Sequence, residues 1–306
     1  MGKTKYKNTK NSRLAVFCFI CAYVLFDKNY YLLANLLKTQ QIIKIACHSQ
    51  FFSGIIKLTK EKLVMEKFIV KFAETEQEKM QTYKLRYSEL ILEYRPDNVN
   101  DVCYDVNEYD EHAKLAICID TDTNQVVGSY RIITSDLLPK DKKFVSEEEF
   151  DISSLKNSGE SIAELSRAVI KREYRGSMVL MLLLRFVIGY IRENNYRYII
   201  GEASFFGTDK MALQKEISYI AHNHFSPDYE IKSLDKDQIK LLNVGEYDAS
   251  EVRRSLPPLF RAYISFGAFL SKETFCDYSF GSVDTFVLLD TKNCNDRYID
   301  KFVGKA

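Results

Sequence analysis

Two kinds of hydrophobic periodicity follow one another after residue 65 of the chain. Apolar side chains recur at helical spacing over residues 76–94, and an Arg-Pro-Asp sequence comes directly afterwards, which predicts an amphipathic helix that ends there. The alternation in Phe68–Phe72 predicts a short strand before this helix. Leu115–Asp120 and Val126–Thr134 flank a polar Thr-Asp-Thr-Asn-Gln turn, and together they predict a β-hairpin.

The most regular pattern lies between Ser161 and Gly207. A strand-like run, Ile162–Ile170, leads into a basic turn and then into a helix-length apolar run, Met178–Ile191. A second apolar strand, Tyr198–Ala203, follows. Strand, turn, helix and strand in this order predict a βαβ unit whose cationic turn could hold a phosphate at the start of the helix.

The pattern is less regular around this unit. Lys210–His222 and Pro258–Leu270 predict helices, the second closing near Gly267, and Val283–Leu289 predicts a final strand. Irregular structure is predicted for three polar segments, residues 101–112, 135–160 and 225–257. An early helix, an antiparallel hairpin and then a βαβ unit predict one mixed α/β (α+β) domain.

Composition changes this picture only through its charge asymmetry. The 306 residues are 46% hydrophobic and 28% charged, which excludes a disordered chain. The net charge is +1, but residues 1–64 carry a net charge of +9 and the remainder carries −8. A uniformly basic nucleic-acid-binding protein is therefore excluded, and we expect no nucleic acid partner.

The basic amino-terminal segment is predicted to lie outside the folded domain. Its apolar run, Leu14–Phe26, is preceded by lysines like a signal peptide, but no small-x-small cleavage site follows. The run is also shorter than the ~20 residues that span a bilayer as a helix. A Lys-Glu pair shortly before Met65 can be encoded by a ribosome-binding sequence. We hypothesise that Met65 is the true start, with residues 1–64 as an extension and 65–306 as the domain; a weak membrane anchor is the alternative.

Cysteine and histidine offer no metal-ligand pattern. The chain has seven Cys and four His, and its Cys-x-x-Cys pair, Cys18 and Cys21, lies inside the apolar run. Free thiols in a reducing compartment are the default interpretation of this usage, and no metal site is expected.

A set of short motifs occurs in a fixed order over residues 82–302. The motifs are Leu85-Arg86-Tyr87, Asp105 with Glu108-Tyr109-Asp110, Val127–Arg131, Ser146–Leu155, Glu164–Arg167, Gly201 with Ser204-Phe205, Leu256–Leu259 with Tyr263 and Gly267, and Asp277 with Phe280-Gly281 and Val283-Asp284. Each is weak alone. As an ordered set, they resemble the GNAT-fold N-acyltransferases that make lyso-ornithine lipids, also described as hemolysins, and more distantly the acyl-homoserine-lactone synthases. The resemblance implies a GNAT-like fold, in which helices flank a central mixed sheet.

The resemblance also implies an activity. The enzyme would move a fatty acyl chain, such as a 3-hydroxyacyl chain, from acyl carrier protein to the α-amino group of an amino acid such as ornithine, the first step of amino-acid-containing lipid synthesis. The amine would attack directly, without a metal or a covalent enzyme intermediate. No cofactor would be tightly bound, because the acyl-phosphopantetheine of acyl carrier protein, or acyl-CoA, is a co-substrate. The expected location is the cytoplasm, with peripheral contact at the inner membrane face as an alternative.

Three departures from the family pattern bear on the substrates. Ser166 replaces a glycine of the family, and Glu202 replaces a cysteine that is usual before Ala-Ser-Phe. Arg175 and Ser177 stand where a coenzyme-A-binding loop would have glycines, which leaves fewer backbone amides free to wrap a pyrophosphate. The single phosphate of a carrier-protein arm needs fewer amides, so acyl carrier protein is the favoured donor.

Glu164 and Arg167 are the candidate catalytic residues. The ammonium group of an amino acid must lose a proton before it attacks a thioester, and Glu164 is the candidate base. Its alternative role is an ion pair with Arg131 or Arg167, because buried carboxylates are normally paired. A guanidinium on an inner strand is costly unless it grips a carboxylate. Arg131 and Arg167 could therefore bind the substrate carboxylate or join an internal salt-bridge network.

The resemblance assigns further residues to the amino acid site. They are Arg86, Asp105, Asp110, Arg131 and Ser204. Asp105 and Asp110 would line the amine pocket with negative charge. The alternative, an ordinary solvated acidic loop, is equally consistent with the sequence.

The basic turn supplies the candidate donor-binding residues. They are Lys171, Arg172, Arg175, Gly176 and Ser177. These residues could hold the pantetheine phosphate at a helix amino terminus, or dock the acidic carrier protein. The alternative is an ordinary solvated turn. The following helix is predicted to be mainly core, with an edge that could line an acyl tunnel, and Tyr174 or Tyr190 could protonate the leaving thiolate.

Two other functions remain open from the sequence. One is an acyl-homoserine-lactone-type synthase that uses S-adenosylmethionine, against which the long carboxy-terminal segment with Pro257-Pro258 and Phe280-Gly281 speaks. The other is a non-catalytic, membrane-associated lipid-binding protein.

Overall fold

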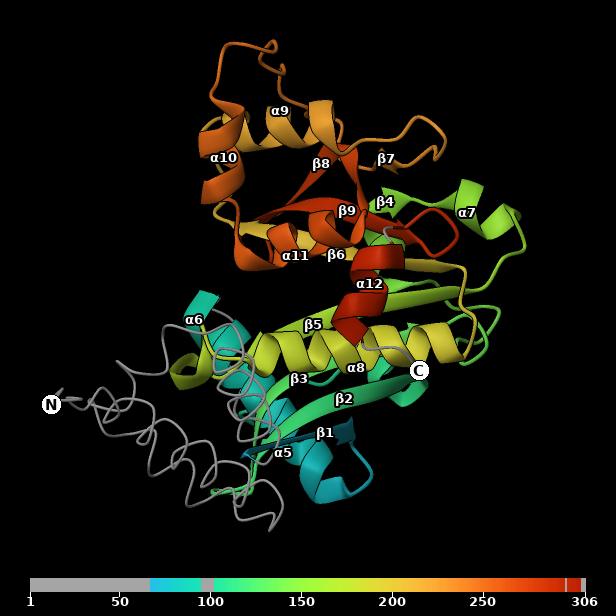
Figure 1. Ribbon diagram of the computed structural model, residues 1–306, viewed down its shortest axis with the longest axis vertical. Coiled ribbons are helices and arrows are strands. Elements are labelled where there is room, and N and C mark those ends of the chain that lie inside the picture. Colours follow the sequence, from blue (N-terminus) through green and yellow to red (C-terminus); the bar gives the residue numbers. More distant parts are fainter. Residues whose placement is uncertain (1–66, 95–101, 295, 304–306) are drawn as a thin grey trace, which may run out of the picture. The chain divides into compact units, whose positions relative to one another are not determined.

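The computed structural model describes residues 67–94, 102–294 and 296–303 (Figure 1). The chain divides after Lys67, and the unit that begins at Phe68 is built around a seven-stranded sheet. The hypotheses about residues 1–64 and about a start at Met65 fall outside the described residues and stay predictions. No helix in the described part of the chain is long and apolar enough to cross a membrane.

The central sheet is antiparallel except at one place. In spatial order its strands are β1 (Phe68–Phe72), β2 (Ala113–Asp120), β3 (Gln125–Thr134), β5 (Ile162–Ile170), β6 (Tyr198–Phe206), β9 (Ser282–Asp290) and β8 (Phe269–Asp277). Only β5 and β6 are paired in parallel among these described strands. The sheet is therefore mixed, as predicted.

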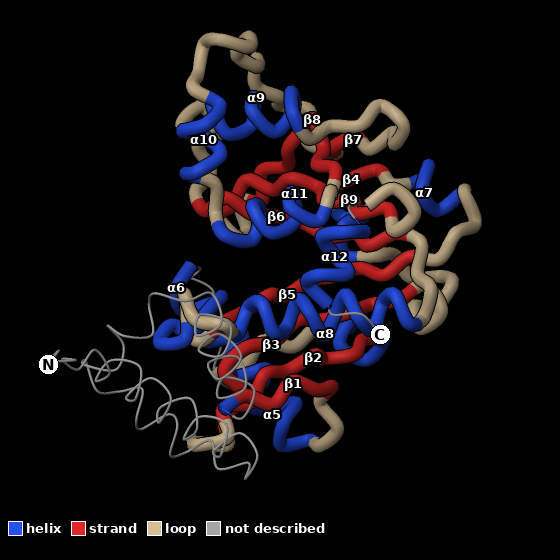
Figure 2. Tube along the Cα trace, in the orientation of Figure 1, coloured by secondary structure: helices blue, strands red, loops and turns tan. Residues whose placement is uncertain are grey.

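The parallel pair divides the sheet into two halves (Figure 2). Pairing begins at Ile162 with Tyr198 and ends at Leu165 with Gly201, although both strands continue well beyond these residues. A Cβ atom on Gly201 would lie 2.5 Å from the carbonyl oxygen of Leu165, so the last paired position requires a glycine. Beyond it the two strands part.

One long helical segment covers one face of the first half. It consists of α5 (Glu76–Arg86), the π-helical η1 (Tyr87–Ile91) and α6 (Leu92–Tyr94), and it packs on β3 and β5. Thr75 and Glu78 start it with a capping box. The predicted helix over residues 76–94 is confirmed, and the predicted Arg-Pro-Asp stop lies outside the described residues.

Helices also cover the opposite face (Figure 1). They are α8 (Val179–Glu193), α9 (Gln214–Asn223), α11 (Pro258–Phe266) and α12 (Asp296–Val303), with α10 (Ala249–Ser255) next to α9. α8 crosses β1, β2, β3 and β5. A Cβ atom on Gly128 would lie 2.7 Å from Cγ1 of Val179, which explains why the helix approaches β3 so closely. α11 ends at Gly267, whose φ of 88° confirms the predicted helix end.

Short elements complete the face on which α5 lies. They are η3 (Glu108–His112), η4 (Val145–Glu148), α7 (Ser153–Asn157) and a two-stranded sheet of β4 (Phe150–Asp151) and β7 (Lys232–Ser233). Phe150 and Ile152 bury their side chains against Ile200 of β6 and Phe286 of β9. This cover lies over the part of the sheet where β5 and β6 separate.

The predicted βαβ unit is confirmed as β5, α8 and β6, with β6 continuing to Phe206. The prediction of irregular structure over 101–112, 135–160 and 225–257 is wrong in part, because η3, η4, β4, α7, β7 and α10 lie there. Strand β8 was not predicted. It starts two residues after Gly267, and a register shift between Leu270 and Thr274 breaks the alternation that marks a strand. Helix α12 was also missed, so Val283–Leu289 is the last strand but not the last element.

Candidate active site

Strand β5 is distorted where it leaves β6. Arg167 has a φ of 51°, a left-handed conformation that is unusual for a residue other than glycine. The pairing of β3 with β5 shifts register at the same level, between Ser129 and Arg131. Strained backbone of this kind persists only where surrounding contacts hold it, and it is concentrated at functional sites. The predicted catalytic strand therefore has an unusual geometry at one of its two candidate catalytic residues.

Glu164 is buried, with 1% of its surface exposed, two residues before Ser166 on β5. Its two carboxylate oxygens accept hydrogen bonds from the backbone N–H groups of Val145 and Ser146, each at 2.8 Å. Burial raises the pKa of Glu164, and the bonds from Ser146 and Val145 and the charge of Arg131 act against this rise. Its hydrogen bonds in the described structure go to η4 rather than to Arg131 or Arg167.

Five of the predicted site residues form one ion-pair network. Arg86 is fully buried, with Nη1 2.6 Å from Oδ1 of Asp110 and Nε 2.9 Å from Oδ2 of Asp105. Arg167 Nε lies 3.1 Å from the same oxygen of Asp105, and Arg131 Nη1 lies 3.5 Å from Oδ2 of Asp110. Burial acts to raise the pKa of Asp105, but the charges of Arg167 and Arg86 outweigh this effect and lower the pKa. These ion pairs hold the acidic segment that contains Asp105 and Asp110 against the sheet.

Arg131 is fully buried beneath this segment. Its Nε donates to Oγ of Ser166 at 2.9 Å, and Nη1 donates to Oδ1 of Asn107 at 2.7 Å. Burial lowers the pKa of Arg131 to about 10, with the charge of Arg167 adding to the effect. The serine that departs from the family pattern therefore satisfies one donor of a buried guanidinium.

The arginines of the basic turn pair with the first helical segment. The turn contains η5 (Arg172–Tyr174). Arg175 Nη2 lies 2.6 Å from Oε2 of Glu93 and 2.7 Å from Oε2 of Glu89. Arg172 Nη2 lies 3.3 Å from the same oxygen of Glu93. Two of the cations predicted to hold a phosphate thus share their charge with carboxylates, and the pKa of Arg175 is raised accordingly.

The remaining donor-site candidates lie where α8 begins. Gly176 has a φ of 80°, and Ser177 Oγ accepts a hydrogen bond from the backbone N–H of Val179 at 3.3 Å. Lys171 donates to the side chain of Gln125 at 3.2 Å. The hydroxyl of Tyr174 donates to Asp120 at 2.8 Å. Gly176 and Ser177 thus lie directly before α8, Lys171 and Arg172 lie further back in the turn, and the donor-binding role of all five residues stays a prediction.

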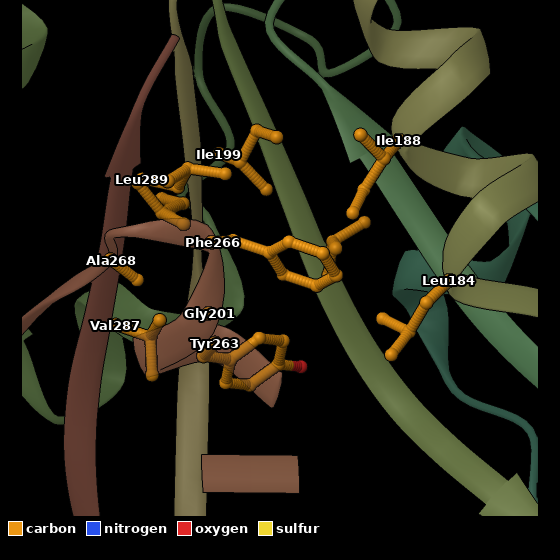
Figure 3. Close-up of a pocket in the computed structure, with 11 residues that line it drawn as sticks. Leu184, Ile188, Ile199, Gly201, Tyr263, Phe266, Ala268, Val287 and Leu289 are labelled. Atoms are coloured by element: carbon orange, nitrogen blue, oxygen red, sulfur yellow. The ribbon is translucent and has the colours of Figure 1, made fainter. Parts of the chain in front are cut away.

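An apolar pocket lies on the opposite face of β5 from Glu164, between α8 and α11 (Figure 3). Its lining residues are Leu165, Leu184, Ile188, Ile199, Ile200, Gly201, Tyr263, Phe266, Ala268, Val287 and Leu289. In Figure 3 the rings of Tyr263 and Phe266 lie between the strands and the side chains of α8. The edge of α8 thus lines a pocket, while the rest of the helix packs in the core. Gly201 also lines the pocket, so the pocket reaches the point where β5 and β6 separate.

Sequence reasoning missed a group of carboxylates on the face of Glu164. Glu149 follows η4, Glu202 lies on β6, and Asp284 lies on β9 opposite the predicted site residue Ser204. One carboxylate oxygen of each is shielded from water and has no hydrogen-bond partner in the described part of the chain. Burial raises the pKa of Glu149 to about 9 and that of Asp284 to about 6, and the pKa of Glu202 lies well above its usual value. These residues are far apart in sequence, so only the fold reveals them as a group.

Other candidate chemistry is sparse among the described residues. Cys118 and Cys276 are free thiols, and burial raises the pKa of Cys118 to about 12. The cysteine and histidine pattern indicated no metal site. Glu149, Asp277 and Asp284 nevertheless place carboxylate oxygens within 4.8 Å of one another, close enough to hold a cation.

Comparison with known proteins gives matches to one class. Residues 85–185 match the family described as acetyltransferase (GNAT) domain. An L-ornithine N(alpha)-acyltransferase of Rhodobacter capsulatus is 25% identical over 248 residues, which cover 78% of this chain and 95% of that protein. The same enzyme of Brucella abortus is 28% identical over 187 residues, 60% of this chain and 66% of that protein. Among solved structures, FeeM, an N-acyl amino acid synthase from uncultured soil microbes, covers 74% of this chain at 10% identity with a TM-score of 0.43.

The mixed sheet flanked by helices and the GNAT domain matched over residues 85–185 define the class: the chain has a GNAT fold and is an acyltransferase. The predicted fold and the predicted type of enzyme are thereby confirmed. Within this class, the curated proteins that it is similar to are L-ornithine N(alpha)-acyltransferases.

Proposed function

We propose that the chain transfers a fatty acyl group, as a 3-hydroxyacyl chain, from acyl carrier protein to the α-amino group of ornithine or a similar amino acid. The observation that carries this proposal is the likeness to the Rhodobacter capsulatus L-ornithine N(alpha)-acyltransferase, which extends over 95% of that protein. The product would be an N-acyl amino acid, the first intermediate of an amino-acid-containing lipid.

Glu164 is the general base in this proposal. The α-ammonium group must give up a proton before its nitrogen attacks, and an acceptor works best when its pKa is near the pH of the reaction. Burial moves the pKa of Glu164 upwards, in that direction. Each carboxylate oxygen accepts one backbone N–H and keeps a further lone pair, which can take the proton directly or through one water.

Arg167 binds the acceptor's carboxylate in this proposal. Its side chain is 26% exposed, so a small substrate can reach it. Asp105 takes the Nε–H, and a guanidinium has further N–H groups directed in a planar fork that suits a carboxylate. The left-handed backbone at this residue sets the direction of the fork. This arrangement would hold the α-carbon of the amino acid close to Glu164.

The acyl donor enters between the separated strands in this proposal. The fatty chain occupies the apolar pocket between α8 and α11. Gly201, where the two strands separate, is one of the residues that line this pocket. The phosphate of the pantetheine arm lies at the start of α8, near Lys171, where helix amides favour an anion. Arg172, with 68% of its side chain exposed, is available to the acidic surface of a carrier protein.

The chemical step needs no covalent enzyme intermediate. The ammonium group gives one proton to Glu164, the neutral amine nitrogen forms a bond to the thioester carbon, and the carbon–sulfur bond breaks. The second proton that the nitrogen loses passes to the leaving pantetheine thiolate, and Glu164 then releases its proton to solvent, which returns the site to its starting charge. One amide forms for each thioester consumed, so atoms and electrons balance.

Product analysis tests the proposal. The purified full chain is incubated with ornithine and either 3-hydroxyacyl carrier protein or 3-hydroxyacyl-CoA, and products are identified by mass spectrometry. We expect N-acylornithine, formed faster from the carrier protein. Formation of an acyl-homoserine lactone from S-adenosylmethionine would favour the related synthase activity. If no acylated product forms with either donor, the proposal is wrong and a lipid-binding role gains support.

A further inference from the structure

The carboxylates of Glu149, Glu202 and Asp284 are a group that the proposed chemistry does not use. We infer that they form a subsite for the side-chain ammonium of the acceptor, so that the enzyme selects amino acids with a second amino group. This inference rests on the proposed function, because it assumes that the acceptor is an amino acid.

The subsite lies next to the proposed base. Glu164 pairs with Ile200 across the parallel ladder, and Glu202 follows two residues later on the same face of β6. Two residues of a strand correspond to about 7 Å. Asp284 lies on the neighbouring strand opposite Ser204. Glu149 directly follows η4, whose first amides bind Glu164. Glu149 and Asp284 have carboxylate oxygens within 4.8 Å of each other, and the charges of both, like that of Glu164, act on Glu202. The three carboxylates therefore form one group beside Glu164.

Unsatisfied acceptors distinguish this group from an ordinary acidic surface. Asp284 is buried, with 3% of its surface exposed, and its Oδ1 has no hydrogen-bond partner among the described residues. The same is true of Oε2 of Glu149 and Oε1 of Glu202. Buried polar atoms are normally satisfied, and those that are not require an explanation such as a ligand. An ammonium group carries three N–H donors and no acceptor, which matches three orphan oxygens.

The local charge also favours a cation. Glu148, Asp277 and Glu164 add to the negative field around the group, and Asp277 lies within the same 4.8 Å set of oxygens as Glu149 and Asp284. Arg167 is the cation that acts on both Glu149 and Glu202, and Asp105 already pairs with it. Glu149 and Glu202 are partly exposed, although the orphan oxygen of each is shielded from water. A bound ammonium would offset the burial and the mutual repulsion that raise the pKa of these carboxyl groups.

A comparison of two acceptors tests the subsite. Norvaline has the carbon chain of ornithine without the terminal amino group. We expect the full chain to prefer ornithine at least about 100-fold in kcat/KM, because losing one partner of a buried charged contact has effects of this order. Glu202→Gln and Asp284→Asn should each reduce this preference to less than about 10-fold, mainly by raising the KM for ornithine.

The controls separate folding, metal binding and the subsite. Glu230→Gln changes a carboxylate that is 71% exposed and paired with Lys232, and it should leave both acceptors unaffected. Thermal unfolding of Glu202→Gln and Asp284→Asn checks that they fold. Equal use of ornithine and norvaline by the wild type, or an unchanged preference in both variants, overturns the inference. So does activity that EDTA abolishes and Mg²⁺ restores, because a metal ion would then occupy these oxygens.

The outcomes also separate this inference from the proposed function. Acylation of both amino acids at equal rates would leave the N-acyltransferase proposal intact and remove the subsite. Absence of any N-acyl product from either amino acid, with both donors, would instead remove the proposed function itself.

Discussion

At Arg167, a left-handed backbone angle of 51° occurs inside a strand, and the side chain pairs with Asp105. A residue with a Cβ atom is strained there by about 1–3 kcal/mol, and glycine is not. The hydrogen bond between Arg131 and Ser166 fixes the residue before Arg167. The parallel ladder ends at Leu165, so Arg167 itself need not have the backbone angles of a paired strand. Backbone conformation and side-chain chemistry can therefore be separated at this residue.

Arg167→Gly and Arg167→Ala are expected to differ in stability but not in activity. Both remove the guanidinium that we assign to the acceptor's carboxylate, so both should raise the KM for ornithine by about 100-fold. The glycine variant should be more stable than the alanine variant by about 1 kcal/mol, because it relieves the strain. Urea unfolding and steady-state kinetics measure the two effects. Equal stability of the variants would mean that the backbone relaxes when the side chain is shortened.

Glu164→Gln is expected to reduce kcat by about 100-fold, the size typical of a lost general base. It should also lower the free energy of unfolding by about 1–3 kcal/mol, because the new NH2 group faces a backbone N–H of η4. Kinetics are therefore measured well below the melting temperature of the variant.

A matched control is available one turn away. Glu147 Oε2 accepts the backbone N–H of Phe144 at 2.8 Å, and both of its carboxylate oxygens accept from Nζ of Lys156, so Glu147→Gln removes an ion pair and sets an NH2 group against a donor away from Glu164. It should lose stability while it retains kcat. A Glu164→Gln enzyme that keeps its full kcat would reduce Glu164 to the structural role that its two backbone hydrogen bonds indicate.

The sequence located individual site residues with uneven success. Arg86, Asp105, Asp110, Arg131 and Arg167 could be grouped because motifs of one family carry them, and the structure brings them into contact. Their ion pairs could not be predicted, since they join residues up to 62 positions apart. Glu202 and Asp284 stood out in the motifs, but no local signal joined them with Glu149, because what sets the three apart is a carboxylate oxygen that is shielded from water and has no partner among the described residues.

Among the elements, the parallel pair β5 and β6 determines where the site lies. Its ladder stops at Gly201, directly opposite the strand that carries Glu164 and Arg167. The close approach to the Leu165 carbonyl is a contact between backbones, so a side chain at this position has no room to move aside. The opening between the strands thus depends on one glycine.

Gly201→Ala is expected to destabilise the protein by about 1–3 kcal/mol, as overpacking does, and to reduce activity because the strands must move apart near the thioester. Gly189→Ala is the matched control, since its Cβ would lie 3.6 Å from the nearest atom, Cγ1 of Val303. In the interior of α8 this change should stabilise the protein by about 0.5–1 kcal/mol. Chemical denaturation of both variants gives the comparison. A Gly201→Ala protein of wild-type stability would contradict the assigned tight contact.

Elements with strong periodicity were predictable, and elements fixed by tertiary contacts were not. The βαβ unit and the hairpin of β2 and β3 follow from alternation and turn residues. Short pieces such as β4 and β7 exist because they pair with each other across a long stretch of chain. Helix α10 depends on a cap by Asp248, a signal that is common in loops as well.

For the whole molecule, the group of buried carboxylates has a consequence for stability. Burial raises the pKa of Glu149 to about 9 and that of Asp284 to about 6, and it also raises those of Glu202 and Glu164; repulsion from neighbouring carboxylates adds to the rise for Glu149, Glu202 and Asp284. The folded chain therefore binds protons that the unfolded chain has already released. Wherever the folded state binds more protons, the free energy of unfolding falls as pH rises.

Some carboxylates act in the opposite direction at lower pH. Glu93, beside Arg175, has a pKa lowered to about 2. The backbone N–H of Glu74 and the side chain of Lys71 lower the pKa of Glu78 to about 2 as well. Their contribution is complete above the usual glutamate range and is lost as the pH falls towards about 2. The two groups of carboxylates together predict a stability maximum at mildly acidic pH.

The melting temperature of the substrate-free protein is therefore expected to be lower at about pH 8.5 than at about pH 6, because the raised pKa values let the folded chain bind protons at Glu149 and Glu202 that the unfolded chain has released. Glu202→Gln removes one of these two differences in bound protons, so it should flatten the decrease and melt higher than the wild type at about pH 8.5. Glu230→Gln should follow the wild-type curve. A wild-type melting temperature that rises over this interval would contradict the raised pKa values. The substitution that weakens the proposed selection for ornithine would thus strengthen the fold, as expected when a site holds charges that only its ligand can satisfy.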